Sequence, residues 1–305
     1  MFDKEVYGKI LVPVVTPFKE NGDVDYVAQV EIGEMLLRKG WADSFILTGT
    51  TGEFFTMTTE ERIKVFETMY KAFNGRIPLI AGTGAQSTRE TIELTKAAEK
   101  IGYKAVMVVS PYYTKPSQKE ILNHYQAVAR AVNIHIMVYN IPIFTGVNTN
   151  PEMIAELAKE PNIVAIKEEA ELNAKQITAF LNATPEDFII YNGDDTMVLE
   201  SYVQGFERIG GVISGGSQVA GDKIREMIEL LHEGKVMEAS RLQRKLFPLY
   251  RIMGQGGRTN PVCLIKDAMR MMGYPAGYPR LPLLPGNEEE VANVRKMLVE
   301  IGSLK

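Results

Sequence analysis

Two side chains in this sequence are suited to chemistry on a carbonyl group. Lys167 ends the apolar run 162–167, where desolvation lowers the pKa of an ammonium group and exposes a nucleophilic lone pair. Such a lysine can form a Schiff base. Tyr139 also follows an apolar run, and its phenol can carry protons to and from a neighbouring imine or alkoxide. Both also have structural interpretations, since a strand-end lysine can extend to water and a buried tyrosine can simply satisfy its hydroxyl.

Two further clusters carry hydroxyl groups. Thr50 and Thr51 lie in a glycine-flanked turn, whose backbone N–H groups can bind a small carboxylate or simply form a turn and helix cap. Tyr113, in the segment 110–113, suits a site or a packing interface. Together, an amine, a phenol and a hydroxyl pair provide a nucleophile, a proton carrier and a carboxylate seat. Imine chemistry on a keto acid requires these parts.

The elements that position these residues follow a repeating pattern. Short segments rich in Val and Ile alternate with longer segments of helical periodicity, which predicts successive βα units. Eight parallel strands joined by crossover helices favour a closed (β/α)8 TIM barrel, an α/β fold. The predicted strands are Ile10–Val15, Ser44–Leu47, Leu79–Ala81, Ala105–Val109, His135–Tyr139, Ile163–Lys167, Phe188–Tyr191 and Gly211–Ile213. The predicted helices between them are Tyr26–Arg38, Thr59–Phe73, Thr88–Ile101, Gln118–Ala131, Pro151–Lys159, Asn173–Asn182 and Thr196–Gln204.

The strand pattern stops after Ile213, and only helical segments follow. We therefore expect the barrel to span residues 1–220 and a C-terminal helical region, residues 221–305, to pack on it as part of one structural unit. In such barrels the active site lies at the carboxyl ends of the strands, where the clusters described above fall. The predicted C-terminal helices are Gly221–His232, Lys235–Arg251, Pro261–Met272 and Glu288–Ile301.

Charge and composition exclude several classes of partner. The formal net charge of −4 gives no basic field for nucleic acid or an anionic membrane surface. The longest apolar runs are far shorter than the ~20 residues of a membrane-spanning helix. The first residues show no secretory signal pattern, and the single cysteine, Cys263, has no internal partner for a disulfide. We expect a reduced, cytoplasmic protein.

Cofactor motifs are weak in this sequence. Gly82–Ser87 imitates a dinucleotide-binding fingerprint, but a serine takes the third glycine position and the next strand ends without an acidic residue. His124, His135 and His232 are scattered and have no partner at ligand spacing. We expect no metal and no nucleotide cofactor.

Four motifs occur in a characteristic order and spacing: Gly49–Glu53, Ser110–Tyr113, Tyr139–Pro142 and Ile166–Lys167. They resemble the dihydrodipicolinate synthase and N-acetylneuraminate lyase family of class I aldolases, and the resemblance runs from about Gly8 to the C-terminus. It implies pyruvate bound as a Schiff base on Lys167 without a cofactor, in a homotetramer built as a dimer of dimers. It also implies the following roles. Tyr139 is the general acid/base, and Thr51 and Tyr113 extend the proton relay. Tyr113 also reaches a neighbouring subunit. Thr50 and Thr51 hold the pyruvate carboxylate, and Ile213 and Gly193 lie near the ligand.

One position departs from the synthase pattern. The synthases usually have an arginine in the turn after the tyrosine strand, where it binds the carboxylate of aspartate semialdehyde, and Phe144 stands there in this chain. Loss of a bidentate carboxylate clamp costs about 2–4 kcal/mol if the charge stays unpaired. Lys115 or Arg258 is an alternative cation. We regard Phe144 as a substrate-contacting residue that favours another acceptor.

The sequence thus predicts a pyruvate-dependent lyase that acts on 2-keto acids. The first hypothesis is reversible aldol cleavage of a 2-keto-3-deoxy sugar acid. The alternative is 4-hydroxy-tetrahydrodipicolinate synthase, which condenses pyruvate with aspartate semialdehyde in lysine biosynthesis. A second alternative is a catalytically silent member that binds a keto acid, although a binding protein needs no nucleophile.

Overall fold

The computed structural model describes residues 4–170 and 173–304. Its eight strands run parallel, with the order β1 to β8 of a closed barrel, which confirms the predicted (β/α)8 fold. All eight predicted strands are present, with ends that differ by a few residues at most. The strands are β1 (Ile10–Pro13), β2 (Ser44–Leu47), β3 (Leu79–Gly82), β4 (Ala105–Val109), β5 (His135–Asn140), β6 (Ile163–Glu168), β7 (Ile189–Asn192) and β8 (Ile209–Ile213).

Helices alternate with the strands and continue after the last one. The C-terminal helical region is confirmed by α10 to α13. The α-helices are α1 (Lys4–Tyr7), α2 (Tyr26–Lys39), α3 (Thr59–Phe73), α4 (Thr88–Ile101), α5 (Gln118–Ala131), α6 (Pro142–Thr145), α7 (Pro151–Leu157), α8 (Gln176–Ala183), α9 (Val198–Gly205), α10 (Ser217–His232), α11 (Val236–Met253), α12 (Val262–Met271) and α13 (Glu288–Glu300). Within the described residues, no helix is both long enough and apolar enough to cross a membrane.

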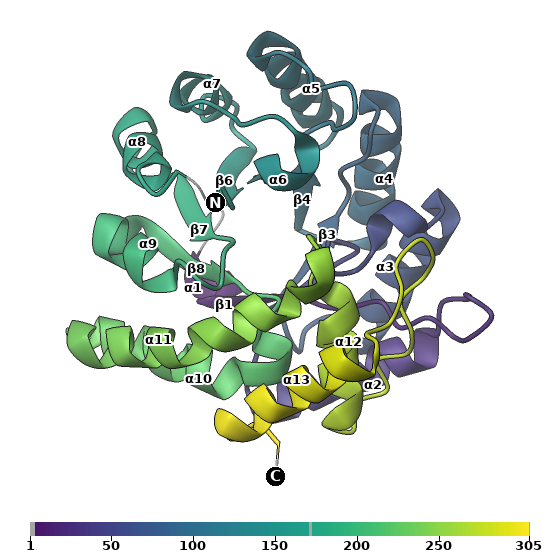
Figure 1. Ribbon diagram of the computed structural model, residues 1–305. Coiled ribbons are helices and arrows are strands. Elements are labelled where there is room, and N and C mark those ends of the chain that lie inside the picture. The colour runs from purple at the N-terminus through teal and green to yellow at the C-terminus, as the bar shows by residue number, and fades with distance from the viewer. Residues whose placement is uncertain (1–3, 171–172, 305) are drawn as a thin grey trace. The chain divides into compact units, whose positions relative to one another are not determined.

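The chain forms two compact units. The first contains the residues up to Lys9 and Pro78–Ile213, and the second contains Ile10–Ile77 and the residues from Ser214 onward. In the first unit, strands β3 to β8 pair in sequence order, and α4, α5, α7, α8 and α9 lie outside them (Figure 1). In the second unit, β1 pairs with β2, and α10 to α13 pack on one another.

Strand burial in the first unit explains its sequence pattern. Every residue of β3, β4 and β7 is buried, as expected for parallel strands covered on both faces. The pairing of β5, β6 and β7 aligns Tyr139 with Lys167 and Lys167 with Tyr191. The register therefore sets the two residues of greatest chemical interest side by side on neighbouring strands.

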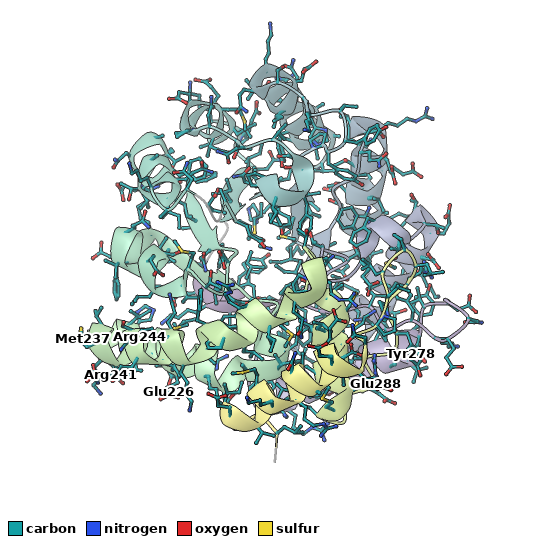
Figure 2. All side chains as sticks on the ribbon, in the orientation of Figure 1. Glu226, Met237, Arg241, Arg244, Tyr278 and Glu288 are labelled. Carbon is teal, nitrogen blue, oxygen red and sulfur yellow. The ribbon has the colours of Figure 1, made fainter. Side chains whose placement is uncertain are left out.

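Helix capping and close packing shape the second unit. Thr58 and Glu61 form a capping box at the start of α3, and Asn287 with Glu290 forms another at α13. Phe73 of α3 packs edge-on against Phe45 of β2, with ring centroids 5.3 Å apart. On α11, Met237, Arg241 and Arg244 are exposed (Figure 2).

Several helices differ from the prediction, among them α8, which begins at Gln176 and not at Asn173, and α6 and α10. The turn after β5 forms the short helix α6, which begins with Pro142 at its first position, where proline fits because no N–H partner is required there. Helix α10 begins at Ser217, four residues before the expected Gly221, and has non-helical backbone at Ala220. The Ser217 N–H donates to the Ser214 hydroxyl (2.9 Å), and this local bond starts the helix early.

Candidate active site

Lys167, Tyr139 and Glu169 form one cluster at the carboxyl ends of β5 and β6. The Lys167 Nζ lies 2.7 Å from Glu169 Oε2, and the Tyr139 hydroxyl donates to the same oxygen over 2.7 Å. The Lys167 ammonium also lies 4.0 Å from the centre of the Tyr139 ring. Only 2% of Tyr139 and 5% of Lys167 are exposed. The first unit therefore brings an amine, a phenol and a carboxylate into direct contact in a largely buried setting.

Backbone hydrogen bonds fix the end of β6 that carries this cluster. Successive side chains of a strand alternate between faces, so Lys167 and Glu169 share one face while Glu168 points to the other. The Glu169 N–H donates to the Asn140 carbonyl (3.0 Å), and the Gly193 N–H donates to the Glu168 carbonyl (2.7 Å). The segment is thereby held from both neighbouring strands, which gives the cluster a fixed geometry.

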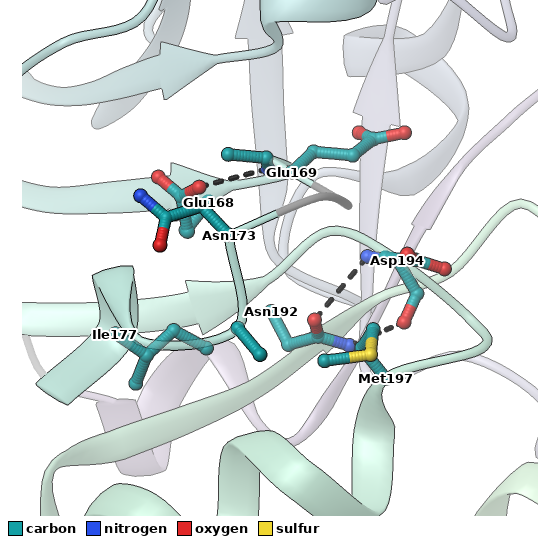
Figure 3. A pocket seen from close by; sticks show the side chains of 9 residues that line it. Glu168, Glu169, Asn173, Ile177, Asn192, Asp194 and Met197 are labelled. Carbon is teal, nitrogen blue, oxygen red and sulfur yellow. Dashed lines mark hydrogen bonds between the residues drawn. The ribbon is translucent and has the colours of Figure 1, made fainter.

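Gly193, directly after β7, makes room for the lysine. A Cβ atom at this position would lie 2.6 Å from Lys167 Cε and 3.0 Å from Glu169 Oε2. A small pocket of about 20 Å³, roughly the space of one water molecule, opens beside Glu169. Its lining includes Glu168, Glu169 and Asp194, and Glu168 and Glu169 extend in different directions (Figure 3).

The electrostatic setting of Glu169 differs from that of a surface carboxylate. Burial raises its pKa, and the nearby charge of Asp194 acts in the same direction. The Lys167 ammonium and the hydrogen bond from Tyr139 oppose this rise. Glu169 is therefore a stronger base than an exposed glutamate, and it is held against the candidate nucleophile.

Glu168 belongs to a polar network on the other face of β6. Its carboxylate accepts hydrogen bonds from the Asn140 side chain (3.0 Å), the Gln176 side chain (3.0 Å) and the Ala170 N–H (2.8 Å). Burial nevertheless raises the pKa of Glu168 to about 7. The network joins β5, β6 and α8 and so supports the strand end that carries Lys167.

The first unit also holds the other predicted residues that lie at or after the ends of strands β4, β5 and β8. Ile213 is the buried last residue of β8. Phe144 lies in α6 and is 39% exposed. Tyr113 follows β4, is 88% exposed and has a backbone φ of 72°, a strained left-handed conformation for tyrosine.

Thr50 and Thr51 lie in the second unit, in the turn after β2. The Gly52 N–H donates to the Gly49 carbonyl and the Glu53 N–H to the Thr50 carbonyl, each over 3.0 Å, which closes the predicted turn. The Thr51 hydroxyl oxygen would lie 3.5 Å from a Cβ atom on Gly215, the second residue after β8. The turn keeps both threonines partly exposed.

Two residues considered from sequence have structural explanations. A Cβ on Gly84 would lie 2.5 Å from the Val109 backbone nitrogen, so close packing against β4 explains this glycine of the apparent nucleotide motif. Arg258, one of the two alternative cations, donates to both oxygens of Glu290 and to the carbonyls of Leu284 and Pro285. Its guanidinium is engaged within the second unit.

Sequence reasoning missed Glu169. The available signal was its spacing, because a residue two positions after Lys167 at a strand end faces the same side. That spacing alone does not distinguish a catalytic glutamate from an ordinary solvent-exposed one. The Tyr139 bond to Glu169, between residues thirty positions apart, required the pairing of β5 with β6.

Comparisons with known proteins identify the family of this chain. The model of the dihydrodipicolinate synthetase family matches residues 6–301. The 4-hydroxy-tetrahydrodipicolinate synthase of Desulforudis audaxviator is 41% identical over 294 residues, 96% of this chain and 97% of the relative. Among solved structures, a dihydrodipicolinate synthase of Bacillus anthracis matches with a TM-score of 0.91 at 33% identity, covering 98% of this chain and 99% of that one. YagE of Escherichia coli K12, a protein of the same family described in complex with pyruvate, matches with a TM-score of 0.90 at 25% identity, covering 97% and 99%.

The barrel and the family match place the chain among the class I pyruvate aldolases, and it is accordingly a lyase. It belongs to the dihydrodipicolinate synthetase family.

Proposed function

We propose that this chain binds pyruvate as an imine on Lys167 and forms or breaks a carbon–carbon bond at the pyruvate methyl carbon. One observation carries the proposal: the Lys167 amine is buried and contacts both a phenol and a carboxylate, and that carboxylate, Glu169, lines a small pocket. Such an amine can attack the keto carbon once it has lost its proton, and the adduct then loses water to give the imine.

The family resemblance implies the roles of the remaining site residues in this chemistry. Tyr139 supplies the proton that the departing hydroxyl group needs, and Thr51 and Tyr113 extend the relay. The amides of Thr50 and Thr51 hold the pyruvate carboxylate, while Ile213 and Gly193 shape the space beside it. The protonated imine withdraws the electrons itself, so the reaction requires neither metal nor nucleotide.

For the second substrate we propose aspartate semialdehyde, which makes the reaction that of 4-hydroxy-tetrahydrodipicolinate synthase. The names of the relatives, among them those of Desulforudis audaxviator and Bacillus subtilis, support this alternative better than the sugar-acid reaction expected first from sequence. Lys115 supplies a further argument. A Cβ on Gly146, the residue that caps α6, would lie 2.9 Å from Lys115 Cε. A cation therefore stands beside the turn from which the arginine is missing.

Reversible aldol cleavage of a 2-keto-3-deoxy sugar acid is the second candidate. Phe144 favours it, because a half-exposed phenyl group in α6 offers no bond to a second carboxylate. A neutral polyhydroxy aldehyde has no carboxylate, so its binding does not depend on the arginine that Phe144 replaces.

Two measurements test these proposals in turn. Incubation with pyruvate followed by borohydride reduction and peptide mass analysis should give a pyruvyl-sized adduct on Lys167, and none in Lys167→Ala. Absence of an adduct at saturating pyruvate would favour the silent binder. Values of kcat/KM for aspartate semialdehyde, 2-keto-3-deoxygluconate and N-acetylneuraminate then identify the acceptor. A preference for either sugar acid would overturn the synthase assignment.

We also propose a cytoplasmic homotetramer, a dimer of dimers. The exposed, strained Tyr113 supports it, since a subunit interface would give this side chain a partner. Sedimentation velocity on the wild type and on Tyr113→Ala tests this assembly, and a monomeric wild type would contradict it.

A further inference from the structure

We propose that Glu169 is the base that removes a proton from the methyl carbon of the keto acid bound to Lys167, and that it returns this proton in the reverse reaction. The inference rests on the proposed imine at Lys167. It adds a catalytic residue whose action can be measured without any aldehyde.

The geometry of one oxygen atom carries the argument. Glu169 Oε2 lies 2.7 Å from the Lys167 Nζ and accepts the Tyr139 hydroxyl over 2.7 Å. In an imine on Lys167, the methyl carbon of pyruvate is two bonds from Nζ. A carboxylate within hydrogen-bond distance of that nitrogen is therefore within reach of the methyl hydrogens, as a general base requires.

The position of the carboxylate is fixed on three sides. The Glu169 N–H is bonded to the Asn140 carbonyl, and its side chain is anchored by Lys167 and Tyr139. Because Gly193 has no side chain, Lys167 and Glu169 can occupy the space beside β7 together. The pocket also reaches Glu169, so the carboxylate is not sealed away from a ligand as a purely structural ion pair would be.

The proposed step is balanced. The Glu169 carboxylate takes a proton from the methyl carbon, the C–H electrons form the new carbon–carbon double bond, and the imine electrons move onto Nζ. The products are a neutral enamine and a protonated Glu169. The enamine carbon then attacks the aldehyde, and the resulting alkoxide takes a proton from the Glu169–Tyr139 pair. Burial raises the pKa of Glu169, which strengthens it as a base.

The experiment compares the wild type with Glu169→Gln, which keeps the size of the side chain and removes the base. In D2O with pyruvate alone, NMR measures the exchange of methyl hydrogens for deuterium, and borohydride trapping measures the imine on Lys167. We expect Glu169→Gln to keep the adduct and to lose at least about 100-fold in exchange rate. Glu186→Gln is the matched control, because this carboxylate is 92% exposed and should exchange at the wild-type rate.

The pH profile separates a base from a structural group. Wild-type exchange should fall as the pH drops through the raised pKa of Glu169, because the ionised form is required. This acidic limb should disappear in Glu169→Gln. Glu169→Asp keeps a carboxylate but withdraws it by one methylene, so it should retain the limb at a lower rate and provides a second test if the glutamine variant does not fold.

Three results would overturn the inference. An exchange loss below about 100-fold in a folded Glu169→Gln that still forms the adduct would show that another group is the base. Loss of the adduct itself would show that Glu169 acts only by positioning Lys167. Absence of a wild-type adduct would remove the proposed function and this inference with it.

Discussion

Each compact unit holds a buried lysine that is paired with a glutamate, but the two pairs differ in what else surrounds them. In the first unit, Lys167 pairs with Glu169, which lines a pocket and has a side chain that is 19% exposed. In the second unit, Lys266 pairs with Glu53, and both side chains are completely buried. Lys266 also donates to the Tyr278 carbonyl, and Glu53 accepts the Arg280 N–H.

This difference separates a reactive pair from a structural one. Burial lowers the pKa of Lys266 and raises that of Glu53, yet no ligand can reach either group. The extra hydrogen bonds satisfy the remaining donors and acceptors, which is what a buried ion pair needs to be stable. A buried lysine thus indicates a nucleophile only where a pocket reaches its partner, so that the partner can exchange protons with a ligand.

The largest expected effect is at the reactive lysine. Lys167→Ala should reduce kcat by at least about 1,000-fold, because the covalent intermediate can no longer form. Steady-state kinetics and borohydride trapping check this outcome. An adduct of unchanged yield on another lysine would show that the wrong pair had been assigned as reactive.

The structural pair should show the opposite result: its disruption should lower stability and leave the chemistry of Lys167 intact. Lys266→Met leaves Glu53 buried without its cation, which should lower the free energy of unfolding by about 3–5 kcal/mol. The double variant Glu53→Leu/Lys266→Met should recover most of this loss, since no unpaired charge remains. Urea denaturation measures both, and the folded variants should still form the adduct on Lys167. A stable but adduct-free Lys266→Met would contradict the distinction.

Glu168 is a third buried glutamate, and it differs from Glu169 and Glu53 because amide and N–H donors hold its carboxylate instead of a lysine. Its pKa is raised to about 7, so between about pH 4.5 and 7 the folded state keeps a proton that the unfolded state has released. Stability should therefore fall as the pH rises through this window, by up to about 3 kcal/mol from this group.

Glu168→Gln should remove that part of the pH dependence. Urea denaturation of both proteins at pH 5 and pH 7.5 measures it, and the variant should lose less stability than the wild type between the two values. Equal losses would mean that Glu168 titrates alike in the folded and unfolded states.

The smallest expected effect concerns Lys115, which is neither a nucleophile nor part of a buried ion pair. Lys115 is exposed and forms no ion pair with a carboxylate of the described residues. If it binds the carboxylate of the acceptor, Lys115→Met should raise KM for aspartate semialdehyde by up to about tenfold, which corresponds to about 1.4 kcal/mol. The control is Lys119→Met, an exposed lysine of α5. An equal KM in both variants would show that Lys115 does not bind the carboxylate of aspartate semialdehyde, and the synthase assignment would lose that support.

Local patterns predicted most of the fold. Apolar strand segments, helical periodicity and the Thr58–Glu61 capping box depend on residues close in sequence, so they could be recognised without tertiary information. The ends of the elements were less well predicted. The starts of α6 and α10 depend on turn geometry, such as the Ser214 bond to the Ser217 N–H, that periodicity does not encode.

The sequence by itself determined the barrel class and singled out Lys167 and Tyr139, because strand ends in parallel α/β folds are where reactive residues gather. Only the tertiary structure showed that Lys167 and Tyr139 share Glu169, and that Lys266 is paired with a carboxylate 213 residues away. The physical reason is that a lysine becomes nucleophilic or structural through its burial and its partners. Strand pairing and helix packing set both of these properties, and neither is local in the sequence.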